Sequence, residues 1–279
     1  MDEAEDSREK VKRIQVQHHD EEGWLQSGET GNMKTELIYE DREILVVYKP
    51  AGFATQTAGI GQADVVSELK NYIWQTDRKT EQTKPAGNTQ PYLGVIHRLD
   101  QPVEGLLVFA RNARAAAHLS RQLQRQDAEG GFCKCYYAVV CGRPPELEGR
   151  LEDYLRKRDG RAEIMELSSK EGSGWEARRA CLRYRILQIL DRPEIALADI
   201  RLETGRFHQI RAQMAHGGMA LLGDRKYGDD KSLRIGGELD IQNAALCAYR
   251  LEFVHPVSGG KMEFQVKPGG KAFSFFSQL

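Results

Sequence analysis

Apolar residues occupy every second position in several separate stretches of this chain. The clearest stretch runs through Ala245, Cys247, Tyr249, Leu251 and Phe253. Successive side chains of a β-strand point to opposite faces of a sheet, so this alternation predicts strands with one face against a core. The same pattern, or a short continuous apolar run, predicts further strands at 44–48, 106–110, 136–140, 182–186, 198–202 and 264–266.

Only a few segments have the periodicity of a helix. Apolar residues recur at helical spacing over 65–73, behind Asp64, and over 116–123, behind Asn112. Asp and Asn are residue types that cap helix N-termini. A third helix is predicted at about 207–216. Because strands and helices do not alternate regularly, the sequence predicts an α+β fold around a mixed, largely antiparallel sheet with flanking helices.

Charge is distributed unevenly along the chain. The formal net charge is −1, but residues 1–40 carry 11 acidic and 5 basic residues, so the remainder carries a net charge of +5. A mildly basic body is compatible with a nucleic-acid partner. Residues 1–34 lack hydrophobic periodicity and are expected to form a flexible acidic extension. We expect one folded domain over 35–279, with a polar loop at 77–90 and a mobile excursion at 151–180.

Composition and motifs disfavour several classes of protein. Apolar runs fall short of the roughly 20 residues that cross a bilayer, so no membrane association is expected. The acidic N-terminus does not resemble a secretory signal, and a cytoplasmic location is expected. We find no Rossmann motif, P-loop or metal-ligand spacing, and therefore expect no metal and no cofactor. Five cysteines without Cys-x-x-Cys spacing are expected to be reduced thiols: Cys133, Cys135, Cys141, Cys181 and Cys247.

The stretch HRLDQPVEG, residues 97–105, places charged side chains between two apolar runs. Asp100 could be an ordinary turn residue that bonds to its own backbone. It could also be a reactive carboxylate, because an arginine beside a partly buried carboxylate keeps it ionised, as a nucleophile or base requires. Both interpretations are open on these residues alone.

The stretch TGRFHQIR, residues 204–211, leaves a predicted strand and opens a predicted helix. Free backbone N–H groups and the helix dipole attract anions at such a position. Arg206 and Arg211 add two permanent cations, and His208 and Gln209 add hydrogen-bonding groups. The alternative is a surface helix that merely carries arginines. The clustering of Arg206, His208 and Gln209 at one junction weakens this alternative without removing it.

Five stretches, taken in order, resemble the motifs of the RluA family of pseudouridine synthases. They are KPAG at 49–52, HRLD at 97–100 with GLLV at 105–108, KCYYAVVCG at 134–142, TGRFHQIR at 204–211 and LGDRKYG at 222–228. Any one tetrapeptide is weakly specific, whereas the ordered set is highly specific. The resemblance covers about residues 36–268. It implies a catalytic domain over 35–279 with a central basic cleft across the sheet, which isomerises uridine in rRNA or tRNA by base flipping without a cofactor.

The resemblance also implies roles for individual residues. Asp100 would be the catalytic aspartate, Arg211 its basic partner, and Tyr136 the aromatic residue that stacks on the target uracil. Arg98 would enter the RNA stack in place of the flipped nucleotide. RNA is the expected partner, and a monomer is expected. The other residues expected to contact RNA are Lys49, His97, Arg206, His208 and Gln209.

The loop after Asp100 departs from the family pattern. The family usually has Thr-Ser-Gly where this chain has Val103-Glu104-Gly105. A carboxylate at 104 that faced Asp100 would repel it, so we expect Glu104 to turn to solvent or to pair with an arginine. The departure keeps open a catalytically silent RNA-binding protein. A glycoside hydrolase that uses both carboxylates is a further alternative, which the nearby arginines disfavour because they suit polyanions.

Overall fold

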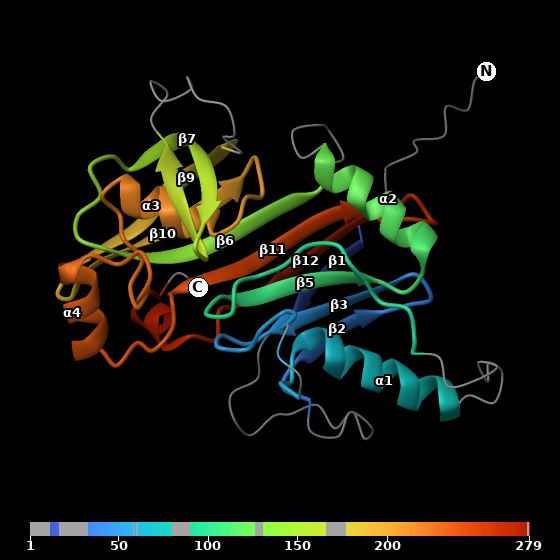
Figure 1. Cartoon of the computed structure of the whole chain (residues 1–279). Helices are drawn as coiled ribbons and strands as arrows, with labels where there is room; N and C mark the ends of the chain where they lie inside the picture. The colour runs from blue at the N-terminus through green and yellow to red at the C-terminus, as the bar shows by residue number, and fades with distance from the viewer. Residues whose placement is uncertain are drawn as a thin grey trace, which may run out of the picture.

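One continuous sheet runs through the described part of the chain (Figure 1). The computed structural model describes residues 12–16, 33–57, 59, 61–79, 90–125, 131–165, 177–277 and 279. Within them, the main path of the sheet has the order β2-β3-β5-β11-β6-β10-β9-β7-β8. These strands are β2 (Glu36–Glu40), β3 (Ile44–Lys49), β5 (Glu104–Ala110), β11 (Leu246–Val254), β6 (Cys133–Cys141), β10 (Glu194–Leu202), β9 (Arg178–Asp191), β7 (Glu148–Arg158) and β8 (Arg161–Met165).

Three further strands join this path at its sides. Strand β12 (Lys261–Val266) pairs with β11, β1 (Lys12–Val16) pairs with β12, and β4 (Gly94–Val95) pairs with β5. The β1·β12 and β5·β11 pairs are parallel, and the other pairs are antiparallel. The prediction of a mixed, largely antiparallel sheet is confirmed.

Helices cover both faces of the sheet. Helices α1 (Val65–Lys79) and α3 (Gln209–His216) contribute Leu69 and Met214 to one apolar cluster. Helices α2 (Ala113–Gln124) and α4 (Asp230–Glu238) contribute Leu119 and Ile235 to the cluster on the other face, together with Phe273 of the 3-10 helix η2 (Lys271–Phe275). None of the helices within the described residues is long and apolar enough to span a membrane.

The predicted helix starts are confirmed by their hydrogen bonds. Asn112 Oδ1 accepts from Ala115 N at 2.9 Å at the start of α2. Asp64 Oδ1 accepts from Ser67 N at 2.7 Å at the start of α1. Such side-chain acceptors satisfy N–H groups that have no partner within the helix.

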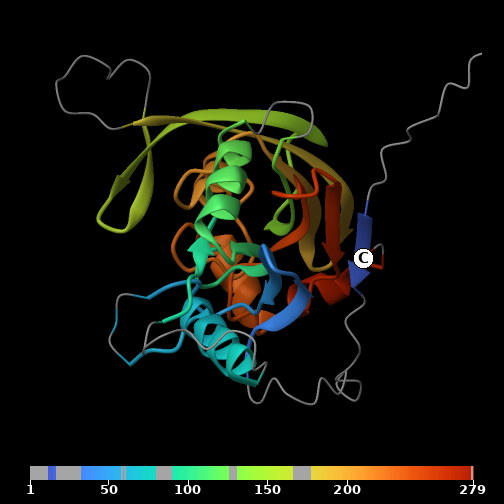
Figure 2. The same cartoon turned by 90° about the vertical axis from the view of Figure 1, so that its right-hand side faces the viewer.

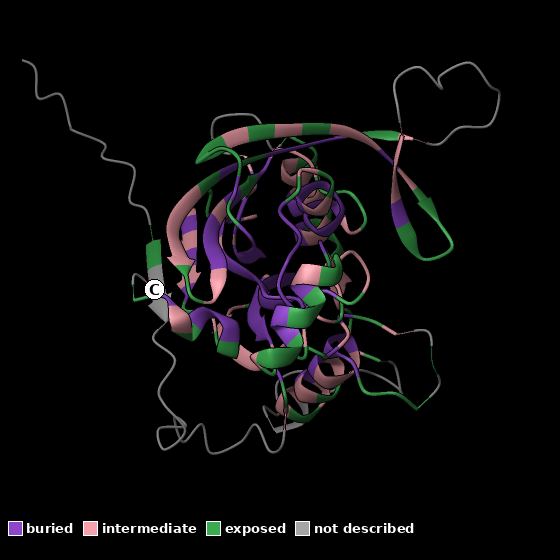
Figure 3. Cartoon of the chain, turned by 90° about the vertical axis from the view of Figure 1, so that its left-hand side faces the viewer, coloured by how far each residue is buried: buried purple, intermediate pink, exposed green. Residues whose placement is uncertain are grey.

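Two sequence expectations about loops differ from the structure. Much of the excursion expected at 151–180 is strand: β7 and β8 form a hairpin that projects from the body (Figure 2), and β9 pairs with β7. The hairpin is exposed at its tip (Figure 3), so its charged residues give no apolar alternation to read. Residues 12–16, within the expected N-terminal extension, form β1. The remainder of both segments includes 1–11, 17–32 and 166–176, which lie outside the described residues.

Gly105 marks the place where β5 and β11 approach each other. Its φ angle is +121°, and a Cβ at this position would lie 2.5 Å from the backbone N and O of Ala248. Other residues could not be accommodated there. This close pairing fixes the start of β5, and therefore the end of the loop that carries Asp100.

Candidate active site

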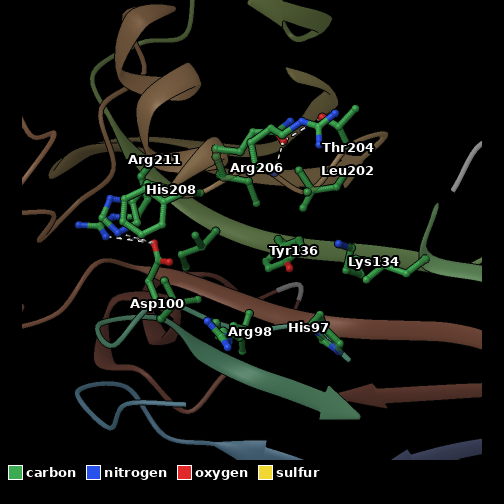
Figure 4. A pocket seen from close by; sticks show the side chains of 18 of the residues that line it. His97, Arg98, Asp100, Lys134, Tyr136, Leu202, Thr204, Arg206, His208 and Arg211 are labelled. Carbon is green, nitrogen blue, oxygen red and sulfur yellow. Dashed lines mark hydrogen bonds and ion pairs between the residues drawn. The ribbon is translucent and has the colours of Figure 1, made fainter. Parts of the chain in front are cut away.

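A groove of about 780 Å³ runs between the Asp100 loop, strand β6 and the start of α3 (Figure 4). Asp100 comes from the loop, Tyr136 from β6, and the segment 202–211 from the end of β10 and the first turn of α3. Cationic side chains outnumber carboxylates in its lining, which fits the expected basic cleft. The charged lining residues are Arg98, Lys134, Arg206 and Arg211, against Asp100 and Glu203.

The Asp100 loop is held by the turn that follows β3. Thr55 Oγ1 donates to Leu99 O at 2.8 Å and accepts from Leu99 N at 3.2 Å. Gly52 N donates to Gln101 O at 2.8 Å. The backbone on both sides of Asp100 is therefore bonded to a second segment, which fixes the direction of the carboxylate.

Lys49 belongs to the same support and does not face the groove. It is 0% exposed, and its Nζ donates to the carbonyls of Pro50, Phe53 and Gln101 at 2.9, 2.7 and 3.2 Å. Burial lowers the pKa of Lys49 to about 7. This placement contradicts the expectation that Lys49 contacts RNA, because its side chain is not exposed at the surface.

Arg211 connects Asp100 to a second, fully buried carboxylate. Its Nη1 donates to Asp100 Oδ2 at 3.1 Å, while its Nε and Nη2 donate to the two oxygens of Asp224, each at 2.7 Å. The two-bond fork of Arg211 is therefore made with Asp224, and Asp100 receives a single bond. Burial opposes ionisation of Asp224, but the Arg211 bonds outweigh it and lower the pKa of that carboxyl.

Asp100 keeps one oxygen available. Its side chain is 23% exposed, and both polar contacts described for it, with Arg211 and His208, are made by Oδ2. Within the described residues, Oδ1 has no hydrogen-bond partner. The carboxylate is thus oriented through one oxygen and open to a ligand through the other.

His208 stands beside Asp100 as a neutral ring. Its Nε2 lies 3.6 Å from Asp100 Oδ2, and its Nδ1 lies 2.9 Å from the hydroxyl of Tyr227. Ala162 N donates to that hydroxyl at 2.6 Å, so the hydroxyl proton is available for Nδ1 and the ring proton is assigned to Nε2. Burial lowers the pKa of His208 to about 4, so it offers no cation to RNA near pH 7.

Tyr136 is buried in the wall of the groove, on β6. No described residue forms a hydrogen bond with its hydroxyl. Burial, and to a lesser extent the charge of Asp100, raises the pKa of Tyr136, so the phenol stays protonated. A ring in this position can pack against a planar ligand that enters the groove beside Asp100.

Of the other predicted RNA-binding residues, two lie at the rim and two are buried. Arg98 and Arg206 are exposed; Arg98 donates to Gln56 Oε1 at 2.9 Å and Arg206 Nε donates to a backbone carbonyl at 3.0 Å. Gln209 is 3% exposed and its amide bonds within the 181–209 segment. His97 is also buried, and its pKa is lowered to about 3 by burial. Direct RNA contacts by Gln209 and by a charged His97 do not fit this placement.

Glu104 points away from the groove but not to solvent. It is 5% exposed, accepts from the Tyr48 hydroxyl, and accepts from the backbone N–H groups of Gly269 and Gly270 at 3.2 and 3.0 Å. The expectation that Glu104 avoids Asp100 agrees with this direction, whereas its described donors are a phenol and two backbone N–H groups rather than the expected solvent or arginine. A pocket of donors from the C-terminal segment takes the carboxylate instead.

Sequence reasoning did not assign a role to four residues that shape the site. Asp224 and Tyr227 hold Arg211 and His208, Thr55 holds the loop, and Lys134 lines the groove. Asp224, Tyr227 and Lys134 lie within stretches already noted for their family resemblance, which was the available signal. Thr55 lies outside those stretches.

Comparisons with known proteins agree with this geometry. A family model described as RNA pseudouridylate synthase matches residues 43–216. Ribosomal large subunit pseudouridine synthase D of Zymomonas mobilis is 33% identical over 242 residues, 86% of this chain and 71% of that protein. The protein of the same name from Vibrio cholerae is 31% identical over 258 residues, 90% of this chain and 71% of that protein.

Solved structures share the fold at lower identity. Human RNA pseudouridylate synthase domain containing 1 has a TM-score of 0.63 at 17% identity, covering 88% of this chain and 86% of that chain. Human RNA pseudouridylate synthase domain containing 4 has a TM-score of 0.62 at 19% identity, covering 86% and 92%.

Proposed function

Because this chain belongs to the RNA pseudouridine synthase family, and is an isomerase, we propose that it converts a uridine of structured rRNA or tRNA to pseudouridine with Asp100 as the catalytic group. Two relatives are named for the large ribosomal subunit, which favours rRNA. In this reaction the bond between uracil N1 and the ribose breaks, and uracil C5 bonds to the same ribose carbon. The C5 hydrogen leaves as a proton, and N1 gains one.

The observation that carries the proposal is the half-tethered carboxylate of Asp100. Arg211 holds Oδ2 at 3.1 Å, and Oδ1 faces the groove beside Tyr136 without a protein partner among the described residues. A flipped uridine that packs on the Tyr136 ring would bring its ribose toward that oxygen. Arg211 fixes the carboxylate through Oδ2, and either nucleophilic attack or proton abstraction by Asp100 would use the open oxygen.

The rim of the groove suits an RNA backbone. Arg98 and Arg206 are exposed on opposite sides of the opening, one on the Asp100 loop and one at the entrance to α3 (Figure 4). Phosphate contacts from such arginines position RNA without reading its sequence. We assign to Arg98, the residue two positions before Asp100, the place in the stack that the flipped nucleotide leaves.

The glycoside-hydrolase alternative is disfavoured because Asp100 has no suitable second carboxylate among the described residues of the groove. Such enzymes need two carboxylates about 5 to 9 Å apart that both face the sugar. Glu104 is turned into a pocket of donors on the far side of the loop. Glu203, the other groove-lining carboxylate, is bound by Arg150 and Arg183. Asp100 therefore acts without an acidic partner in this proposal.

The test is release of tritium from RNA labelled at uridine C5. Wild type should release tritium from total rRNA or tRNA of a strain that lacks the gene, and Asp100→Asn should release less than about a hundredth as much, because an amide is neither nucleophile nor base. RNA affinity should stay within about threefold, since phosphate contacts carry most binding. No release by wild type would indicate a silent RNA-binding protein. Retention of a tenth of the rate by Asp100→Asn would remove Asp100 from the chemistry.

A further inference from the structure

We propose that Lys134 forms a cationic subsite of the groove, next to Tyr136 on β6, that binds one oxygen of the RNA. The inference deepens the proposed function and rests on it. Lys134 and Tyr136 are two residues apart on one strand, so their side chains leave the same face of the sheet. Both line the groove (Figure 4).

Lys134 is a largely buried side chain that lines the groove. It is 5% exposed, and no described residue gives it a hydrogen bond or an ion pair. Buried charges in proteins are normally paired, because taking an unpaired charge out of water is costly. Lys49, which is 0% exposed, illustrates the ordinary case, since its Nζ donates to three carbonyls. Lys134 has no such set, although it opens into a groove that a ligand can fill.

His97 provides a second unsatisfied donor in the same lining. Its Nε2 accepts from Val108 N at 3.3 Å, so the ring proton is assigned to Nδ1. Nδ1 is buried and has no hydrogen-bond partner within the described part of the chain. Lys134 and His97 cannot satisfy each other, because both are donors. The fully buried Nδ1 of His97 is closed to a ligand, whereas an oxygen of a ligand in the groove would give Lys134 the acceptor it lacks among the described residues.

The protonation of Lys134 is consistent with this role. Burial lowers its pKa to about 8, and a cation is therefore still the main form near pH 7. The lining offers Lys134 no nearby carboxylate contact, and Asp100 is bound by Arg211 instead. The charge is left available to the substrate rather than used inside the protein.

RNA supplies two kinds of oxygen that could reach this position. One is a phosphate oxygen of a nucleotide next to the flipped uridine, and the other is a carbonyl oxygen of the uracil itself. A phosphate is the better match for a full positive charge. Residues two apart on a strand are separated by roughly 7 Å, which is comparable to the spacing of neighbouring nucleotides in a stretched strand.

The test compares Lys134→Met with wild type in the full-length chain. Binding is measured by fluorescence anisotropy with a fluorescein-labelled single-stranded oligouridylate, over a series of salt concentrations. We expect affinity to fall at least about fivefold and the slope of log affinity against log salt to shrink by about 0.7, the effect of one contact to single-stranded phosphate. Lys271→Met, at an exposed lysine on η2, is the matched control and should stay within about twofold.

Thermal unfolding separates a binding role from a structural one. Methionine fills a similar volume without a charge, so Lys134→Met should unfold at the same or a higher temperature than wild type. Lower stability together with unchanged affinity would overturn the inference, because Lys134 would then serve the fold. Unchanged affinity with unchanged stability would overturn it as well.

A second probe identifies the source of the oxygen. An abasic ribose-phosphate oligomer of the same length should lose affinity for Lys134→Met as the oligouridylate does, if the ligand is a phosphate. A loss confined to the oligouridylate, with an unchanged salt slope, would assign the uracil carbonyl. Neither readout uses turnover, so a failure of wild type to form pseudouridine would reject the proposed function and leave this subsite standing.

Discussion

The two carboxylates of HRLDQPVEG lie four residues apart and meet opposite surroundings. Asp100 is partly exposed in the groove, and one of its oxygens has no described protein partner. Glu104 is 5% exposed and receives a phenol and two backbone N–H groups. Both are carboxylates of one short stretch, yet Asp100 has an oxygen without a described partner, whereas Glu104 is enclosed by hydrogen-bond donors.

The difference separates a carboxylate that can do chemistry from one that stabilises the fold. A largely buried set of donors around Glu104 ties the start of β5 to the segment at Gly269 and Gly270, far along the chain. The Asp100 carboxylate receives one bond from Arg211, whose two-bond fork goes to Asp224. Removing Glu104 should therefore cost stability, and removing Asp100 should cost activity.

The largest effect on folding is expected for Glu104→Ala. Loss of the carboxylate leaves the Tyr48 hydroxyl and two N–H groups buried without this acceptor, and we expect the free energy of unfolding to fall by about 3 kcal/mol. Asp100→Ala is the matched variant and should change it by less than about 1 kcal/mol, because Arg211 keeps Asp224. Urea unfolding of both variants measures the contrast. Equal losses would show that the two carboxylates do not differ in structural role.

A smaller effect, on rate, is expected for Arg211→Lys. An ammonium cannot make the fork with Asp224 and also reach Asp100, so kcat should fall at least about tenfold, or about 1.4 kcal/mol. Arg234→Lys, at an exposed arginine of α4, controls for the substitution itself. Tritium release under saturating RNA gives kcat. A rate equal to wild type would mean that Asp100 needs no guanidinium, and would weaken its contrast with Glu104.

Much of the sheet could be predicted because its strands have one apolar face. The apolar alternation at 245–253 coincides with β11, which begins one residue later at Leu246. The side chains of Asn112 and Asp64 cap α2 and α1 as expected. The β7–β8 hairpin was missed because it projects from the body and carries charge on both faces. Periodicity reports burial, and a strand that buries little leaves no pattern.

The sequence predicted the pair of residues at the centre of the site, but not the residues that hold this pair in place. Asp100 and Arg211 lie together as expected, whereas the Asp224 fork depends on a carboxylate that the chain brings back 13 residues later. Lys49 was expected to contact RNA, whereas the three carbonyls around its Nζ make its burial possible. Glu104 meets donors more than 160 residues away. Such contacts form only when distant segments of the chain pack together, which local sequence patterns do not reveal.

The smallest effect is expected for Glu104→Gln, which should leave the pH–rate profile in place. Two carboxylates about 5 Å apart would repel by about 3 kcal/mol at an effective dielectric near 20, or roughly two pH units in the titration of either one. Glutamine keeps the shape of Glu104 and one acceptor for its donors, and removes only the charge. Because Glu104 points into the pocket of Tyr48 and Gly270, we expect the acidic limb of kcat to move by less than about half a unit. A shift of the acidic limb by more than about one unit to lower pH would show that the charge of Glu104 acts on the groups of the groove. The two carboxylates would then interact electrostatically, and the contrast between them would fail.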